Sequence, residues 1–233
     1  KSTTIYAAVN DIQSPEKNII TVENPIEYRL DFASQVTASN DKSFTFADAL
    51  RAILRQNPNV IMLGEVRDAE TGSVAAEAAL TGNLVLSTML SGDAIGSIFR
   101  LLNLGISPFW LASTLAGIVY QQRVRTICTG CKEEYEVTAA EQTEYLHTFP
   151  GVTKFFRGKG CEKCGMSGYG GRTAIHEVLA INDQLKDLIY QQASILKLKE
   201  AATAAGFESI SQDAVRKVSM GVTTVQEFFR AVG

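Results

Sequence analysis

The sequence predicts an α/β fold with a mostly parallel sheet, an inserted module of four cysteines and a C-terminal helical subdomain. Three observations lead to this prediction. Short aliphatic runs alternate with longer segments of helical periodicity in the first half of the chain, two Cys-x-x-Cys pairs follow, and the remainder is helical in pattern. Strands and helices that alternate through short connections are typical of a parallel sheet covered on both faces.

The size and charge of the chain limit its classes of function. Its 233 residues suit one large domain, or one domain with an appendage, and 45% hydrophobic residues are enough to form a core. A net charge of −3 argues against a general nucleic-acid surface, so we expect no nucleic-acid partner. No apolar run is long enough to span a bilayer and no signal peptide is visible, which predicts the soluble interior of a cell.

Val60–Leu63 is the strand around which the predicted sheet is organised. Its four apolar residues run without a polar break between Pro58 and Gly64, which predicts a strand buried on both faces. Asn18–Val22 and Leu84–Leu86 predict two further buried strands. The segments between them have helical periodicity and predict helices over Ile5–Gln13, Asp41–Gln56, Ala69–Leu80, Asp93–Leu104 and Phe109–Gln122.

The second half of the chain follows the cysteine pairs. Gly168–Arg172 predicts a flexible turn, and Arg172–Ile181 predicts a strand that returns to the main sheet. Helices are predicted over Asp183–Gln192, Ala193–Ala205, Ser211–Gly221 and Val225–Val232, the last capped by Thr223 and Thr224. We therefore expect four parts: a core over 1–125, a cysteine module over 126–171, a returning strand over 172–182 and a helical subdomain over 183–233.

Polar side chains follow each predicted strand at its carboxyl end. Glu23 and Glu27 follow the first, Glu65 follows the second, and Ser87 and Thr88 follow the third. Ligands collect at the carboxyl ends of strands in an open parallel sheet. An acid there can hold a water on Mg²⁺ or polarise an attacking water, and a hydroxyl can sense a γ-phosphate. The alternative for each residue is an ordinary turn or surface position.

Four further residues have the chemistry of phosphate contacts. The chain opens with Lys1 and Ser2, and a P-loop ends in Gly-Lys-[Ser/Thr], where the Lys contacts the β- and γ-phosphates and the hydroxyl binds Mg²⁺. Arg51 and Arg55 are four residues apart on a predicted helix. They could reach a phosphate on a neighbouring subunit, or they could be solvated surface charges.

The cysteine pairs are the strongest chemical signal in the sequence. Tetrahedral Zn²⁺ with four thiolates requires two tight Cys-x-x-Cys turns that the fold brings together. A redox pair and unmetallated buried thiols are the alternatives. Four protein ligands leave no open position, so we expect a structural metal without catalysis. The predicted ligands are Cys128, Cys131, Cys161 and Cys164.

Several motifs occur in one order along nearly the whole chain. They are Lys1–Thr4, Thr21–Glu27, Arg51–Arg55, Gly64–Asp68, Leu80–Gly82, the paired Cys-x-x-Cys and Gly171–Thr173. On these motifs the chain resembles the C-terminal ATPase domain of the secretion ATPase superfamily. Within it, the chain is most similar to the type II secretion and type IV pilus assembly ATPases. The type IV pilus retraction ATPases look less similar because they generally lack the tetracysteine module.

The resemblance implies a fold, a reaction and partners. The fold would be a RecA-like P-loop NTPase core, and the cofactors would be ATP, Mg²⁺ and Zn²⁺. The protein would be a bacterial homo-hexameric motor, cytoplasmic and peripheral to the inner membrane through its partners. Its ATP hydrolysis would drive pilin or pseudopilin assembly through an inner-membrane platform protein.

The resemblance also assigns roles to individual residues. Lys1 and Ser2 match the end of the Walker A motif, Glu23 and Glu27 match the acids of the Asp box, and Glu65 matches the Walker B glutamate. The remaining matches are Arg51 and Arg55 with two arginines of a common family stretch, and the four cysteines with the zinc-binding tetracysteine motif.

Three departures from the family pattern affect these roles. The chain begins inside the Walker A motif, so a chain starting there is expected to bind ATP weakly or not at all and to be inactive alone. Asn24 stands at the Asp box aspartate, and Leu90 stands at the histidine of the His box. Leucine can neither donate to a phosphate nor transfer a proton. Two hypotheses follow: a working motor, or a zinc-stabilised binding or scaffold subunit with weak or no hydrolysis.

Overall fold

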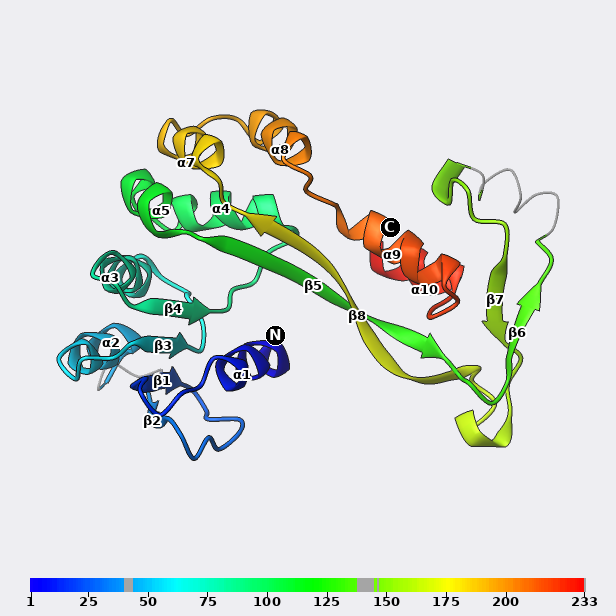
Figure 1. The fold of residues 1–233 in the computed structure, drawn as a ribbon, viewed down its shortest axis with the longest axis horizontal. Helices are drawn as coiled ribbons and strands as arrows, with labels where there is room; N and C mark the ends of the chain where they lie inside the picture. The colour runs from blue at the N-terminus through cyan, green and yellow to red at the C-terminus, as the bar shows by residue number, and fades with distance from the viewer. Residues whose placement is uncertain (40–43, 138–144, 146, 233) are drawn as a thin grey trace. The chain divides into compact units, whose positions relative to one another are not determined.

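Four parallel strands in the order β2-β1-β3-β4 form the sheet of the first half of the chain (Figure 1). The computed structural model describes residues 1–39, 44–137, 145 and 147–232. The strands are β1 (Ile19–Glu23), β2 (Ser34–Thr37), β3 (Val60–Leu63) and β4 (Leu84–Ser87). The predicted parallel sheet is thereby confirmed. β2 was not predicted, because Ser-Gln-Val-Thr is short and mostly polar and owes its strand geometry to pairing with β1.

The described residues divide into two compact units. We call Lys1–Gly117 with Ala180–Ala204 the sheet unit, and Ile118–Leu179 with Ala205–Gly233 the cysteine unit. The boundary between the two units falls between residues 204 and 205. It therefore lies inside the segment 183–233, which we expected to form one helical subdomain.

The central strands of the sheet unit are buried and its described edge is not. All four residues of β3 are buried, as predicted. β4 is present as predicted, but the expectation that it is buried is wrong, since Leu84 is 46% exposed. β4 lies at the edge of the four-stranded sheet, and an aliphatic run does not distinguish a central strand from an edge strand.

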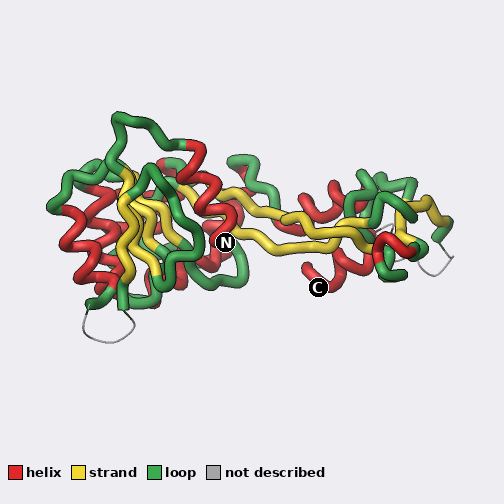
Figure 2. Tube along the Cα trace, turned by 90° about the horizontal axis from the view of Figure 1, so that it is seen from below, coloured by secondary structure: helices red, strands yellow, loops and turns green. Residues whose placement is uncertain are grey.

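Helices cover both faces of the sheet (Figure 2). α1 contributes Ile5 and Val9 to a buried cluster with Val60 and Met62, the alternate residues of β3 that share one face. The helices of the sheet unit are α1 (Ser2–Asp11), α2 (Phe46–Leu54), α3 (Ala69–Leu80), α4 (Ala94–Asn103), α5 (Pro108–Thr114), α7 (Asp183–Tyr190) and α8 (Ile195–Ala204).

Local signals set several of these helix ends. Thr45 and Asp48 form a capping box at the start of α2, where 41–43 of the predicted helix lie outside the described residues. Asp68 caps α3, whose predicted bounds are confirmed. The prediction of one helix over Phe109–Gln122 is wrong, because α5 ends at Thr114 and a strand follows.

The cysteine unit is built on a two-stranded sheet of β5 (Gly117–Ile127) and β8 (Tyr169–Ala180). β8 pairs with β5, so the prediction that this strand returns to the main sheet is wrong. The predicted turn at Gly168–Arg172 is also corrected, since β8 begins at Tyr169. The β-branched and aromatic residues Ile118, Val119 and Tyr120 favour a strand once β8 supplies a partner.

A second hairpin and two helices complete this unit. Phe149, Phe155 and Phe228 lie in its buried cluster. Thr224 accepts a hydrogen bond from the backbone N–H of Glu227, which confirms its predicted capping role. The remaining elements are β6 (Lys132–Tyr135), β7 (Phe155–Gly158), the 3-10 turn η1 (Glu162–Cys164), α9 (Ile210–Ser219) and α10 (Val225–Val232). Among the described residues, no helix has the length and apolar character required to span a bilayer.

Candidate functional site

The carboxyl ends of β1, β3 and β4 meet at one edge of the sheet. Val22 of β1 pairs with Leu63 of β3, and Leu63 pairs with Ser87 of β4. Just past the strands, the Thr88 hydroxyl donates a hydrogen bond of 2.7 Å to the Gly64 carbonyl oxygen. The Gly64 N–H donates in turn to the carbonyl oxygen of Val22 at 2.8 Å. Parallel pairing therefore brings the residues that follow the three strands side by side.

Glu23 is buried at this edge, and its carboxylate accepts hydrogen bonds from neighbouring side chains. The residue is only 3% exposed. One carboxylate oxygen accepts hydrogen bonds from the Thr21 hydroxyl at 2.6 Å and the Gln35 amide at 3.2 Å. The other accepts from the Tyr6 hydroxyl. Burial, followed by the bond to Glu23, raises the pKa of Tyr6, so this phenol remains a neutral donor.

Glu27 is exposed and lies beside the start of α1. The Ser2 hydroxyl donates to the Glu27 carboxylate at 2.6 Å. The backbone N–H groups of Glu27 and Tyr28 donate to the Tyr6 hydroxyl at 3.3 and 3.2 Å. The loop after β1 is thereby attached to the first turns of α1. A helix N-terminus presents free N–H groups and a partial positive charge, which favour an anion.

Glu65 is held ionised. The Arg67 guanidinium donates to its carboxylate, and the Glu65 side chain is 25% exposed. The bond from Arg67 is the main reason that the pKa of Glu65 lies below its usual range; partial burial opposes the shift, and the charges of Arg67 and Lys1 add to it. Lys1 and Glu65 therefore belong to the same electrostatic environment.

The two candidate arginines lie on or directly after α2 and do not follow any of these strands. Arg51 forms an ion pair of 2.8 Å with Glu70 in the first turn of α3, and a longer one of 3.8 Å with Asp48. Arg55 follows α2 directly, just before the chain enters β3. Arg55 therefore lies at the opposite end of β3 from Glu65.

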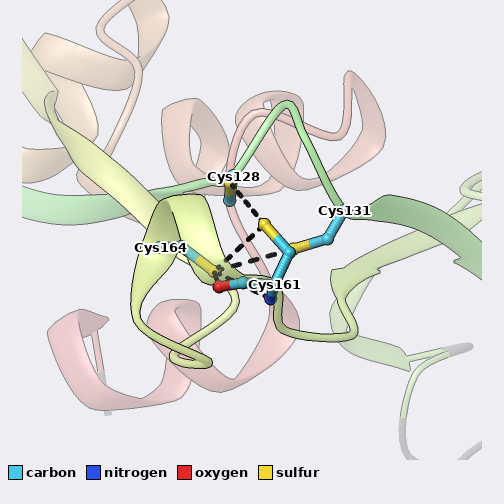
Figure 3. A group of neighbouring side chains, drawn as sticks. All are labelled: Cys128, Cys131, Cys161 and Cys164. Atoms are coloured by element: carbon cyan, nitrogen blue, oxygen red, sulfur yellow. Dashed lines mark hydrogen bonds between the residues drawn. The ribbon is translucent and has the colours of Figure 1, made fainter.

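The four cysteines form one cluster in the cysteine unit (Figure 3). Their sulfur atoms all lie within 4.8 Å of one another, and three of the Sγ–Sγ distances are 3.7, 3.8 and 3.9 Å. Four sulfurs at about 2.3 Å from a central Zn²⁺ in a tetrahedron are separated by about 3.8 Å. The cluster thus has the dimensions of a tetrahedral zinc site.

Backbone geometry supports the second cysteine pair. The N–H groups of Cys161 and Gly168 both donate to the Cys164 sulfur at 3.3 Å, and Gly165 adopts the left-handed conformation with φ of 57°. Burial opposes ionisation of Cys164, but these N–H donors outweigh it and lower the pKa of this thiol to about 6. Burial raises the pKa of Cys131 to about 12. A cation is the species that allows all four thiols to ionise together.

Sequence reasoning missed the residues that hold the acids in place. Tyr6 lies four residues after Ser2 on one helix face, and Thr21 lies two residues before Glu23 on one strand face. Those two spacings were available signals. Gln35 lies on the unpredicted β2, so no local pattern identified it.

Comparisons with known proteins agree on one family. The family model described as Type II/IV secretion system protein matches residues 1–230. The chain is 42% identical over 230 residues to the type II secretion system ATPase E of Vibrio cholerae, covering 99% of this chain and 46% of that protein. It is 38% identical over 229 residues to the type IV pilus assembly ATPase PilB of Thermus thermophilus, covering 97% and 26%.

A solved structure is similar to the chain as well. The crystal structure of the pilus retraction motor PilT with bound ADP matches with a TM-score of 0.71 at 27% identity. That match covers 99% of this chain and 57% of the PilT chain. The chain spans less than half the length of the two curated relatives named above.

Proposed function

Because the chain belongs to the Type II/IV secretion system protein family, we propose that it is the C-terminal motor domain of a hexameric ATPase. ATP hydrolysis by this motor would power type II protein secretion or type IV pilus assembly. The same proposal includes an inner-membrane platform protein as partner and a cytoplasmic location at the bacterial inner membrane. The observation that carries it is the meeting of the α1 N-terminus with the acids that follow β1 and β3.

ATP would place its phosphates at the start of α1. Lys1 would neutralise charge on the β- and γ-phosphates, and the N-terminus of α1 would favour the same anion. Ser2 and Glu65 fit Mg²⁺, because a hydroxyl and an ionised carboxylate are the oxygen ligands that this ion prefers. When bound, Mg²⁺ supplies charge neutralisation between the two phosphates.

The three candidate acids would have different tasks. Glu65, which is ionised and partly exposed, would hold and orient a water. Glu27 is exposed beside Ser2 and would orient the attacking water. Glu23 is buried against three donors, so it would act by fixing the loop that carries Glu27. Thr88 would respond to the γ-phosphate from the end of β4.

Arg51 and Arg55 would act between subunits. Both are exposed, Arg51 on α2 and Arg55 at the C-terminal cap of α2, and Arg55 lies near the end of β3 that does not carry the acids. A contact to nucleotide would therefore require a neighbouring copy of the chain. The four cysteines would bind one structural Zn²⁺ that holds β6 and β7 to the β5–β8 sheet.

The proposal is tested by phosphate release from Mg-ATP in the full-length protein. Glu65→Gln keeps the shape of the side chain and removes its charge, so kcat is expected to fall by about 10²–10⁴-fold. Glu77→Gln, an exposed acid on α3, is the matched control and should leave kcat unchanged. Equal phosphate release from Glu65→Gln and the unmodified protein would reject the motor assignment.

A second candidate function is a zinc-stabilised subunit with weak or no hydrolysis that acts as a binding or scaffold component. Leu90 favours it, because this side chain is 64% exposed on the loop after β4 and offers no proton or hydrogen bond. Asn24 removes one carboxylate from the loop after β1. Under this alternative, Leu90→His combined with Asn24→Asp raises phosphate release. A clearly active protein that gains nothing from the two substitutions contradicts it.

A further inference from the structure

Four arginines of the cysteine unit line one cavity of about 350 Å³. Arg123 and Arg125 come from β5, Arg172 from β8 and Arg230 from α10. We call this cavity the arginine pocket. The proposed nucleotide chemistry uses none of the four residues.

One buried carboxylate fixes two of these arginines. The Glu227 side chain has no exposed area, and its two oxygens accept from Arg230 Nε and a terminal nitrogen at 2.9 Å each. Arg125 donates to the same carboxylate through Nε at 2.9 Å, a terminal nitrogen at 2.7 Å and its backbone N–H at 2.8 Å. The Arg125 guanidinium also lies 3.9 Å from the centre of the Tyr169 ring. Both guanidinium groups are therefore held in place before any ligand arrives.

The guanidinium N–H groups of the other two arginines are available to a ligand. Within the part of the chain that the structure describes, the side chains of Arg123 and Arg172 form no hydrogen bond or ion pair. Four guanidinium charges and one carboxylate leave the pocket with a net charge of +3. Like charges gathered in a cavity repel one another and raise the local concentration of anions.

We propose that the arginine pocket binds a phosphate-bearing ligand with two or more negative charges. Guanidinium groups match phosphate oxygens through paired hydrogen bonds, and a diphosphate group could engage several of them at once. The cavity volume lies at the lower end of the range for small-molecule sites, which suits a diphosphate better than a segment of folded protein. This inference does not rest on the proposed motor function.

Isothermal titration of the chain with inorganic pyrophosphate tests the site. The double variant Arg123→Gln/Arg172→Gln removes two charges without breaking a hydrogen bond or an ion pair of the described structure, so it should fold normally. Its Kd for pyrophosphate should rise about 100-fold, at about tenfold for each charge-assisted contact. Arg29→Gln, an arginine of the sheet unit that is 91% exposed, is the matched control and should leave Kd unchanged.

A sedimentation arm identifies the source of the phosphate. Phosphatidylcholine vesicles with and without phosphatidic acid are mixed with the chain and with the double variant. Arginine-dependent binding to the phosphatidic acid vesicles supports the pocket as a lipid headgroup site. Arginine-dependent binding of pyrophosphate alone supports a soluble ligand. The proposal is overturned if neither probe binds the unmodified chain, or if both bind the double variant equally well.

Discussion

The Tyr6 hydroxyl on α1 donates a hydrogen bond to the buried carboxylate of Glu23 at the end of β1. The same hydroxyl accepts the backbone N–H groups of Glu27 and Tyr28. One phenol oxygen therefore joins the helix that begins with Ser2 to the loop that carries Glu27. This contact links the packing of α1 on the sheet to the position of the candidate catalytic acid.

Replacing Tyr6 by Phe should separate these two elements while keeping the ring. Glu23 loses one of its three donors and two backbone N–H groups lose their acceptor, so we expect a loss of about 2–3 kcal/mol in unfolding free energy by chemical denaturation. Phosphate release by the full-length protein should fall with it. Tyr28→Phe is the matched control, because that exposed side chain packs edge-on against Tyr6 without a hydrogen bond of its own in the described structure. Equal stability of the two variants would contradict the role of the hydroxyl.

Glu227 should make the stability of the cysteine unit depend on acidic pH. Burial opposes its ionisation, but the bonds from Arg230 and Arg125 outweigh it and lower the pKa of Glu227 from 4.5 to about 2. A carboxyl group with a lowered pKa stabilises the fold above pH 4.5, and that contribution is lost as the pH falls toward 2. At about 1.4 kcal/mol per pKa unit, the contribution is on the order of 3 kcal/mol.

Unfolding measured between pH 7 and pH 2 in the unmodified chain and in Glu227→Gln tests this linkage. The variant should be destabilised at pH 7 and should approach the unmodified chain as the pH falls. Glu134→Gln, which removes only an exposed ion pair with Lys154, should keep the full pH dependence. Parallel pH profiles for Glu227→Gln and the unmodified chain would show that Glu227 is not the group responsible.

Local sequence signals predicted the elements whose ends and burial are set locally. β3 is an apolar run between a proline and a glycine, and α3 begins at the Asp68 cap, so both were predicted with correct bounds. β5 and β8 pair across about fifty residues of sequence, and the helical spacing of apolar residues after Pro108 concealed the first of them. No local pattern reports such a distant partner.

The candidate sites divide in the same way. Parallel strand order was enough to predict that Glu23, Glu65 and Thr88 follow neighbouring strands. The burial of Glu23 depends on Tyr6 and on Gln35 from an unpredicted strand, so the sequence could not assign it a supporting role. The arginine pocket draws on three elements that lie far apart in the chain, and only the folded unit brings them together.

Zinc should be part of the cysteine unit. We expect one zinc ion per chain by inductively coupled plasma mass spectrometry, and a chelator should remove it with a large fall in the unfolding midpoint, since structural zinc contributes on the order of 10 kcal/mol in small domains. Cys131→Ser should abolish zinc binding. Glu162→Gln, on the exposed side of the same cluster, should retain it. Metal-free protein that unfolds at the same temperature would exclude a structural metal.

Gly158 should be as important to this cluster as a cysteine. A Cβ atom at this position would lie 2.7 Å from Gly168 Cα and closer still to its carbonyl oxygen, which accepts the Cys128 N–H at 2.9 Å. Gly158→Ala therefore forces apart the two ends of the segment 158–168, which carries the second cysteine pair. We expect a loss of at least about 3 kcal/mol in unfolding free energy and a lower zinc content. Gly92→Ala has open space around its Cβ and should change stability by no more than about 0.5 kcal/mol. If both alanine variants retain zinc and unfold alike, the close approach of Gly158 to Gly168 does not constrain the cluster.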